Sequence, residues 1–317
     1  MGFYGCDMSK DNFEVHGPDG RLEVKNEPLC IRAWLRAIPK DAVIALESTG
    51  GYGIALAELA HKSGRTVYLL APRQIAAHRR SLGRRAKTDK MDARLIAEFI
   101  QSNHQHLHPY EPWEEPWKTL RDTVRLRTRL AHDRARIALR MRAFGCSMRE
   151  IAGVTKGLKQ MMLKLDANIQ AQLRTVPEAK AVGSPKGVGP LTAAASIGAL
   201  KHVPFKDADA FVAYMGADLI VSDSGKYKGR RVISSWGDVT LRCLFYLAGK
   251  SAAHSPEWKS YVQKLEARGM KPIQIHCAVA RRIARIVYHL YHSGEMYDPD
   301  KIPQKTQDAR PKLASQA

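Results

Sequence analysis

The stretch FYGCDMSKDNFEVHGPDGRLEV, residues 3–24, decides the fold that we predict for the first part of the chain. Residues 3–8 have the alternating pattern of a short β-strand. Residues 13–24 contain two further strand patterns, separated by the turn sequence Pro-Asp-Gly at 18–20. The chain is therefore expected to begin with three consecutive strands.

Helix and strand patterns alternate over the residues that follow. One helical pattern ends at Gly64, and glycine is the residue most often found directly after a helix. Helical patterns cover 28–39, 53–64 and 89–99, and strand patterns cover 42–47 and 66–71. The resulting order, βββαβαβα, predicts an α/β domain with a mixed sheet over residues 1–108.

Beyond this domain the chain is predicted to be helical, so the fold class is α/β plus α. A segment without Gly or Pro between Lys118 and Arg142 carries nine Lys or Arg and two acidic residues, which predicts a long basic helix. Such a helix packs either on its own domain or against a partner helix, and residues 158–173 are a candidate antiparallel partner. We expect a basic helical coiled-coil segment at 109–178, a mostly helical domain at 179–298 and a disordered tail at 299–317.

The composition indicates a polyanionic partner and a reducing compartment. The 317 residues include 51 Lys or Arg and 31 Asp or Glu, a net charge of +20, which favours nucleic acid over a merely soluble basic protein. The five cysteines are scattered and form no CxxC pair, which is typical of reduced thiols and argues against zinc. No apolar run reaches about 18 residues, and no signal-peptide pattern opens the chain. We expect a cytoplasmic protein that does not bind membranes.

Four carboxylates are the candidate catalytic residues of the first domain. Asp7 and Glu47 each lie at the end of a predicted strand, where an open α/β sheet usually binds its ligand. Asp89 and Asp92 are three residues apart and therefore neighbours on one helix face. If that helix crosses the strand ends, all four acids converge.

Convergent carboxylates repel one another unless a cation neutralises them, and hard oxygen ligands select Mg²⁺ or Mn²⁺. Two such ions about 3.5–4 Å apart can act on a phosphodiester. Taken singly, each acid also has a structural interpretation, such as a turn cap, a surface acid or a helix N-cap. Cations next to the aspartate pair are candidates for nucleic-acid binding: Arg84, Arg85, Lys87 and Lys90.

Several blocks, in order along the chain, resemble the DEDD transposases of the insertion-sequence 110 family. They are YGCDMSKDNFEV, ALESTGGYG, KTDKMDARLIAEF, GVGPLTAAASIGAL and RRVISSWGDVTLR. The resemblance implies an RNase H-like (resolvase-type) first domain that holds Mg²⁺ with the four acids, a coiled coil, and a C-terminal transposase domain. It further implies a homo-oligomer, a dimer or tetramer, that uses a non-coding guide (bridge) RNA to pair with donor and target DNA.

The resemblance also implies a serine nucleophile, which aligns with Ser234. The family's Lys and Arg after this serine are replaced by Ser235 and Trp236, so the choice between Ser234 and Ser235 stays open. No His or Asp stands at an obvious triad spacing, so the metal site is expected to activate the hydroxyl. Nearby cations are further candidates for nucleic-acid binding: Lys226, Lys228, Arg230 and Arg231.

Three other functions are compatible with parts of the pattern. A hydrolytic, structure-selective nuclease of the Holliday-junction type would use the same acids with water in place of serine. A non-catalytic nucleic-acid-binding protein would use the acids structurally. The first strand and hairpin also resemble the phosphate loop of actin-like ATPases, but the glycine-rich loop of a second such domain is missing from the sequence.

Overall fold

The computed structural model describes residues 2–48, 51–83, 89–220, 229 and 231–301, with the backbone alone for 89–91 and 301. The chain forms two compact units, Met1–Pro112 and Trp113–Ala317. The basic helical segment therefore belongs to the same unit as the C-terminal helices. Most of the tail that we expected to be disordered, 302–317, lies outside the described residues.

A five-stranded mixed sheet in the order β3-β2-β1-β4-β5 forms the centre of the first unit. β2 pairs antiparallel with both β1 and β3, whereas β4 pairs in parallel with both β1 and β5. The strands are β1 Phe3–Met8, β2 Asn12–Gly17, β3 Gly20–Lys25, β4 Val43–Glu47 and β5 Thr66–Leu70. The predicted mixed α/β sheet is thus confirmed.

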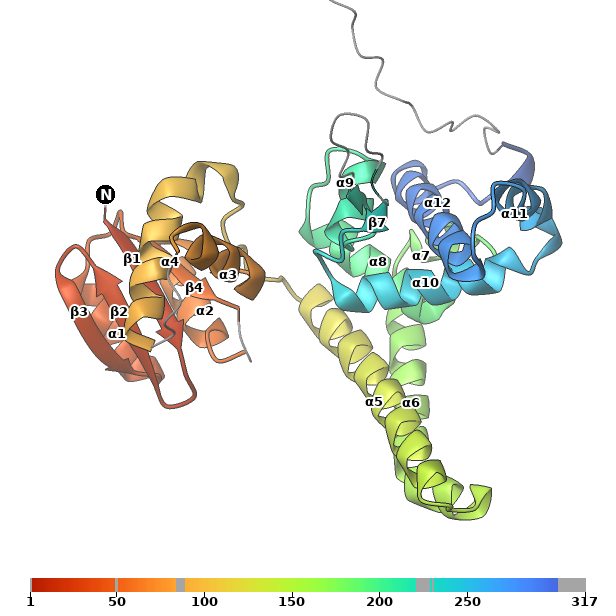
Figure 1. Ribbon diagram of the computed structural model, residues 1–317, viewed down its shortest axis with the longest axis horizontal. Coiled ribbons are helices and arrows are strands. Elements are labelled where there is room, and N and C mark those ends of the chain that lie inside the picture. The colour runs from red at the N-terminus through yellow and green to blue at the C-terminus, as the bar shows by residue number, and fades with distance from the viewer. Residues whose placement is uncertain (1, 49–50, 84–88, 221–228, 230, 302–317) are drawn as a thin grey trace, which may run out of the picture. The chain divides into compact units, whose positions relative to one another are not determined.

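Helices cover both faces of this sheet (Figure 1). One face packs its apolar residues, including Cys6 and Leu46, against α1 and α2, and the other face packs against α3 and α4. The helices are α1 Pro28–Ala37, α2 Ile54–Lys62, α3 Pro72–Ser81 and α4 Asp89–Asn103. The sequence did not lead us to expect α3, because Ile75 is its single fully buried residue and no apolar stripe marks it.

Gly5 lets α4 pass directly over β1. A Cβ atom on Gly5 would lie 2.2 Å from the Ala93 carbonyl oxygen and 2.4 Å from the Ala97 backbone nitrogen. Contacts this short do not occur between a Cβ atom and backbone, so any side chain here would push the helix off the strand. The absence of a side chain at Gly5 therefore fixes the position of α4 on the sheet.

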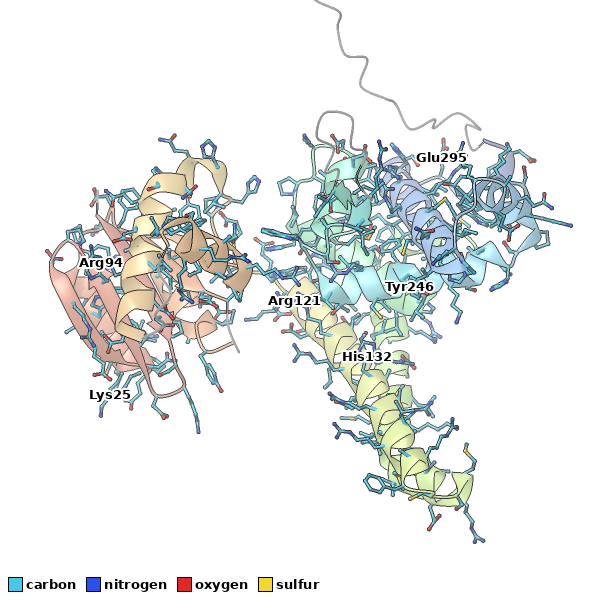
Figure 2. The ribbon with its side chains drawn as sticks, in the orientation of Figure 1. Lys25, Arg94, Arg121, His132, Tyr246 and Glu295 are labelled. Carbon is cyan, nitrogen blue, oxygen red and sulfur yellow. The ribbon has the colours of Figure 1, made fainter. Side chains whose placement is uncertain are left out.

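The second unit begins with a helical hairpin of α5 Trp117–Ala143 and α6 Met148–Arg174 (Figure 1). Leu120 and Val124 of α5 pack with Ile169 of α6, so these apolar side chains of the long basic helix are buried against a helix of the same chain. A turn joins the helices, and Ser147 and Glu150 form a capping box at the start of α6. The side chains along α5 are drawn in Figure 2, where Arg121 and His132 are labelled.

A cluster of shorter helices and one small hairpin completes the second unit. Buried apolar side chains such as Phe211, Phe245, Val279 and Ile283 form its core. The elements are α7 Ala179–Val182, α8 Pro190–His202, α9 Ala208–Tyr214, β6 Leu219–Ile220, β7 Val232–Ile233, α10 Val239–Ala253, α11 Lys259–Glu266 and α12 Pro272–Ser293. Within the described part of the chain, every helix is too short or too polar to cross a membrane.

Candidate functional site

Asp7 and Glu47 lie side by side at the carboxyl ends of two parallel strands. The register pairs Cys6 of β1 with Leu46 of β4, so Asp7 and Glu47 are the next opposed positions. Cys6 and Leu46 point into the core beneath α1 and α2. Because side chains alternate along a strand, Asp7 and Glu47 project from the opposite face, which α3 and α4 cover.

The first turn of α4 is directed toward Asp7. The ring of Phe3, at the start of β1, lies 5.0 Å from that of His104, just after the end of α4, while Gly5 lies beneath Ala93. The helix therefore runs antiparallel to β1, and its first residues approach the carboxyl end of the strand. The structure thus brings Asp92 to the same edge and face of the sheet as the two strand-end acids. Asp89 is the first residue of α4, but its side chain lies outside the described atoms.

Two arginines balance acidic charge on this face. Asp92 is only 5% exposed and accepts a hydrogen bond from the Arg79 guanidinium of α3. Glu14, directly opposite Asp7 on β2, accepts two hydrogen bonds from Arg21, both 2.7 Å long. A divalent cation would therefore compete with Arg79 for Asp92.

The acidic residues suit a hard cation in kind, since Mg²⁺ prefers carboxylate oxygens. Among the side chains that the structure describes, however, no three acidic, His or Cys groups are close enough to hold a metal. Asp92, one of the ligand candidates, is already engaged by Arg79.

Two of the cations that we expected to bind nucleic acid lie at least partly within the described residues. Arg231 is described and exposed. The backbone of Lys90 lies in the first turn of α4, but its side chain is not described. The remaining candidates lie outside the described residues: Arg84, Arg85, Lys87, Lys226, Lys228 and Arg230.

In the second unit, the β6–β7 hairpin sets Ser234 opposite Asp218. Leu219 pairs with Ile233 in the antiparallel ladder, which makes Asp218 and Ser234 the next opposed positions. The backbone N–H of Ser234 donates to the Asp218 carbonyl oxygen at 2.8 Å. The Ser234 hydroxyl also donates to the carboxylate of Asp218.

The sequence did not reveal this contact, because no His or Asp stands at an obvious triad spacing from Ser234. The two strands contain two residues each, too few for a pattern to reveal their register. The available signal was the pair of short apolar segments 219–220 and 232–233 on either side of a glycine- and lysine-containing connection. Interpreted as a hairpin, that pattern places residue 218 opposite residue 234.

The loop after Ser234 has an unusual backbone that fixes the hydroxyl. Ser235 has a φ of 57°, in the left-handed region that non-glycine residues rarely adopt. Its N–H donates to the Gly216 carbonyl oxygen at 3.0 Å, and the Trp236 N–H donates to Ser234 Oγ at 3.3 Å. A Cβ atom on Gly237 would lie 2.1 Å from the Tyr214 carbonyl oxygen. The backbone of this loop therefore packs directly against the backbone of residues 214–218.

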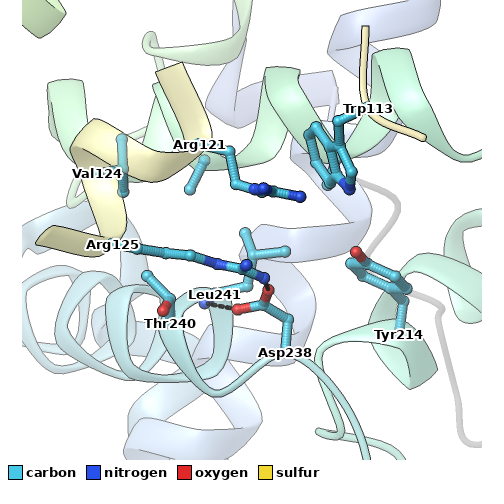
Figure 3. A pocket seen from close by; sticks show the side chains of 10 residues that line it. Trp113, Arg121, Val124, Arg125, Tyr214, Asp238, Thr240 and Leu241 are labelled. Atoms are coloured by element: carbon cyan, nitrogen blue, oxygen red, sulfur yellow. Dashed lines mark hydrogen bonds and ion pairs between the residues drawn. The ribbon is translucent and has the colours of Figure 1, made fainter. Parts of the chain in front are cut away.

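Asp238 ties the end of this loop to two helices. Its carboxylate caps α10 by accepting from the Leu241 N–H at 2.9 Å, and it accepts from Arg125 of α5 at 2.8 Å (Figure 3). A small hollow opens beside this ion pair, and Trp113 and Tyr214 are among its lining residues. Burial, together with the charge of Asp238, raises the pKa of Tyr214 to about 12, so its phenol stays protonated.

Comparison with known families matches most of the two units just described. Residues 5–144 match a DEDD family described as transposase, and residues 179–263 match the family described as transposase IS116/IS110/IS902. The chain belongs to the IS110 family of transposases. Both candidate sites of this transposase fall within the matched ranges.

Individual relatives are similar over most of their length. The transposase is 24% identical to a "Pilin gene-inverting protein" of Moraxella lacunata, over 80% of this chain and 81% of the relative. It is 23% identical to a "Probable family 20 transposase" of Pseudomonas aeruginosa, over 93% of this chain and 98% of that protein. The similarity therefore extends across both units.

Proposed function

We propose that this IS110-family transposase cuts and rejoins DNA with Ser234 as nucleophile and a Mg²⁺ site formed by Asp7, Glu47, Asp89 and Asp92. The observation that carries the proposal is the common edge and face of Asp7, Glu47 and Asp92. Carboxylates gathered at one edge of a sheet are the type of ligand that Mg²⁺ prefers. The strand order β3-β2-β1-β4-β5 supports an RNase H-like assignment for the first unit.

When bound, Mg²⁺, or Mn²⁺ in its place, would polarise the phosphodiester and stabilise the charge that develops on its oxygens. The carboxylates of Asp7, Glu47, Asp89 and Asp92 would hold the ion. Gly5 serves this site indirectly, because it lets α4 lie close enough to β1 for both elements to contribute ligands.

Ser234 would attack the phosphate and retain it as a phosphoserine link. Such a link conserves the energy of the broken phosphodiester, which rejoining requires and hydrolysis wastes. Ser234 is favoured over Ser235 because its hydroxyl donates to a carboxylate, whereas Ser235 occupies the turn position with a positive φ. The names of the Moraxella relatives, which refer to inversion of a gene, support recombination over simple cleavage.

The proposed partners are donor DNA, target DNA and a structured non-coding RNA that pairs with both. The net charge of +20 supports binding to nucleic acids, and the guide RNA rests on the family resemblance. We further propose a homo-oligomer, a dimer or tetramer, in which metal site and serine meet within one chain or between protomers. Exposed apolar side chains on the α5–α6 hairpin support self-association: Leu139, Phe144 and Leu163 are 70%, 88% and 60% exposed.

The test incubates the full-length protein with Mg²⁺, the transcript of the non-coding DNA beside the gene, and labelled duplexes spanning both ends of the element. We expect protein–DNA adducts, with the DNA mapped to Ser234 by mass spectrometry. Asp7→Ala should abolish cleavage, while Glu14→Gln, on the neighbouring strand, should retain it.

Other outcomes would identify the competing functions. A free nick without attached protein would indicate the hydrolytic nuclease. Unchanged activity on DNA after chelation of divalent ions would remove the metal site from the mechanism. Binding without any cleavage, under all conditions that include the RNA, would favour a non-catalytic nucleic-acid-binding protein.

A further inference from the structure

We infer that Asp218 is the proton acceptor for Ser234, an assignment that rests on the proposed serine chemistry and deepens it. The Ser234 hydroxyl donates directly to the Asp218 carboxylate. A serine hydroxyl is a weak nucleophile, and an adjacent base activates it by taking its proton as the new bond forms. Asp218 touches the reacting oxygen, as such a base must.

The Asp218 carboxylate differs from three other aspartates of this unit in what it contacts. Asp238 caps a helix and pairs with Arg125, Asp166 pairs with Arg127, and Asp209 pairs with Arg285. Among the described residues, the side chain of Asp218 has the Ser234 hydroxyl as its one polar partner. No described cation therefore competes with the serine proton for this carboxylate, and a structural ion pair does not account for it.

The backbone holds Ser234 Oγ against Asp218 before any substrate arrives. The hairpin register and the 2.8 Å hydrogen bond between the Ser234 N–H and the Asp218 carbonyl fix the two residues relative to each other. A Cβ atom on Gly216 would lie 2.8 Å from the Trp236 nitrogen, so close packing keeps the loop from sliding past Asp218. Such pre-organisation reduces the entropy lost on reaching the transition state.

Bonds and protons are conserved in the proposed cutting step and in the rejoining step. As Ser234 Oγ bonds to phosphorus, its proton passes to the Asp218 carboxylate. The bond from phosphorus to one bridging deoxyribose oxygen breaks, and that oxygen leaves with the electron pair and takes a proton from water. In rejoining, a deoxyribose hydroxyl attacks the phosphoserine and releases its proton to water. Ser234 Oγ then leaves with its electron pair and recovers the proton from Asp218.

The test measures the rate of adduct formation with the full-length protein, the flanking transcript and labelled junction duplexes. Asp218→Asn keeps an acceptor oxygen and the side-chain shape but cannot take a proton, so we expect a loss of at least about 100-fold. Its thermal unfolding midpoint should match that of the wild type. Asp209→Asn, which removes a surface ion pair in the same unit, is the matched control and should change the rate less than about 2-fold.

A further readout separates proton transfer from a structural role. Formate should accelerate Asp218→Ala in proportion to its concentration, because a free carboxylate can enter the vacated space. An adduct rate in Asp218→Asn equal to that of the wild type would overturn the assignment. The assignment would also fail if both Asp218 variants formed the adduct slowly, had lowered thermal unfolding midpoints, and Asp218→Ala were not rescued by formate.

These results distinguish failure of Asp218 from failure of the serine mechanism. If the wild type forms a Ser234 adduct and Asp218→Asn forms it equally fast, only the base is wrong. If the wild type cleaves DNA without forming any adduct, the serine mechanism is wrong, and the role of Asp218 falls with it.

Discussion

The acidic edge of the first unit and the Ser234 loop of the second are built in different ways. At the acidic edge, the ends of separate elements converge: β1 supplies Asp7, β4 supplies Glu47 and α4 supplies Asp92. At the Ser234 loop, a short hairpin and a turn with positive φ set two side chains against each other. The first site depends on topology and the second on local backbone geometry.

The two sites also balance their charges differently. The acidic edge already contains arginine partners, because Arg79 contacts Asp92 and Arg21 contacts Glu14. Among the described residues, the carboxylate of Asp218 contacts a neutral hydroxyl. In our proposal, Mg²⁺ would replace an arginine at the acidic edge, and Asp218 would accept a proton at the Ser234 loop.

The largest effect should come from Ser234→Ala, which removes the proposed nucleophile. We expect complete loss of the protein–DNA adduct on denaturing gels, with little change in DNA binding measured by mobility shift. Ser235→Gly is the control, because glycine adopts a positive φ without strain and should keep the loop intact. Normal strand exchange by Ser234→Ala would refute the serine mechanism and leave the acidic edge as the single candidate site.

Two glycine substitutions should damage the two sites separately. Gly5→Ala would drive a methyl group into the backbone of α4, and Gly237→Ala would drive one into the carbonyl of Tyr214. We expect each to lower the free energy of unfolding by about 3 kcal/mol, at the upper end for overpacking. Denaturant titration with a spectroscopic probe in each unit would measure this loss.

A glycine in open space provides the control for these two variants. Gly153 lies within α6, and no atom lies within 4 Å of the position of its missing Cβ. Gly153→Ala should therefore stabilise the hairpin by about 0.5–1 kcal/mol. Destabilisation by Gly153→Ala comparable to that by Gly5→Ala would show that close packing is not the cause.

The sequence allowed prediction of the acidic edge better than of the serine loop, for a physical reason. Strand ends and a helix face follow from periodicity, and parallel pairing then brings Asp7 next to Glu47 without further information. The pairing of Asp218 with Ser234 depends on the register of two-residue strands, and the turn depends on a positive φ at Ser235. Neither leaves a periodic pattern. The helix α3, which supplies Arg79, was missed for a similar reason, since it buries so little apolar surface.

Arg79→Met should reveal the competition between arginine and metal at the acidic edge. Without divalent ions, loss of the guanidinium leaves the nearly buried Asp92 charge unbalanced, and we expect a cost of about 2–3 kcal/mol. Mn²⁺ should restore part of this stability and raise the unfolding midpoint more in the variant than in the wild type. Arg21→Met, which breaks the more exposed pair with Glu14, should cost less stability than Arg79→Met and gain no extra response to Mn²⁺.

The smallest effect should come from Arg125→Met, which acts on the serine loop through Asp238. Loss of this ion pair leaves the cap of α10 in place, so we expect the free energy of unfolding to fall by about 1 kcal/mol. Adduct formation should slow by about 5-fold, because ordering the loop would then add about 1 kcal/mol to the activation free energy.

Arg127→Met is the control. Arg127 lies two residues after Arg125 on α5, and it pairs with Asp166 of α6 and not with the Ser234 loop. This substitution should lower stability similarly and leave the adduct rate unchanged. Equal slowing by both variants would mean that α5 affects the reaction through its overall stability, and that Asp238 has no particular role in holding the Ser234 loop.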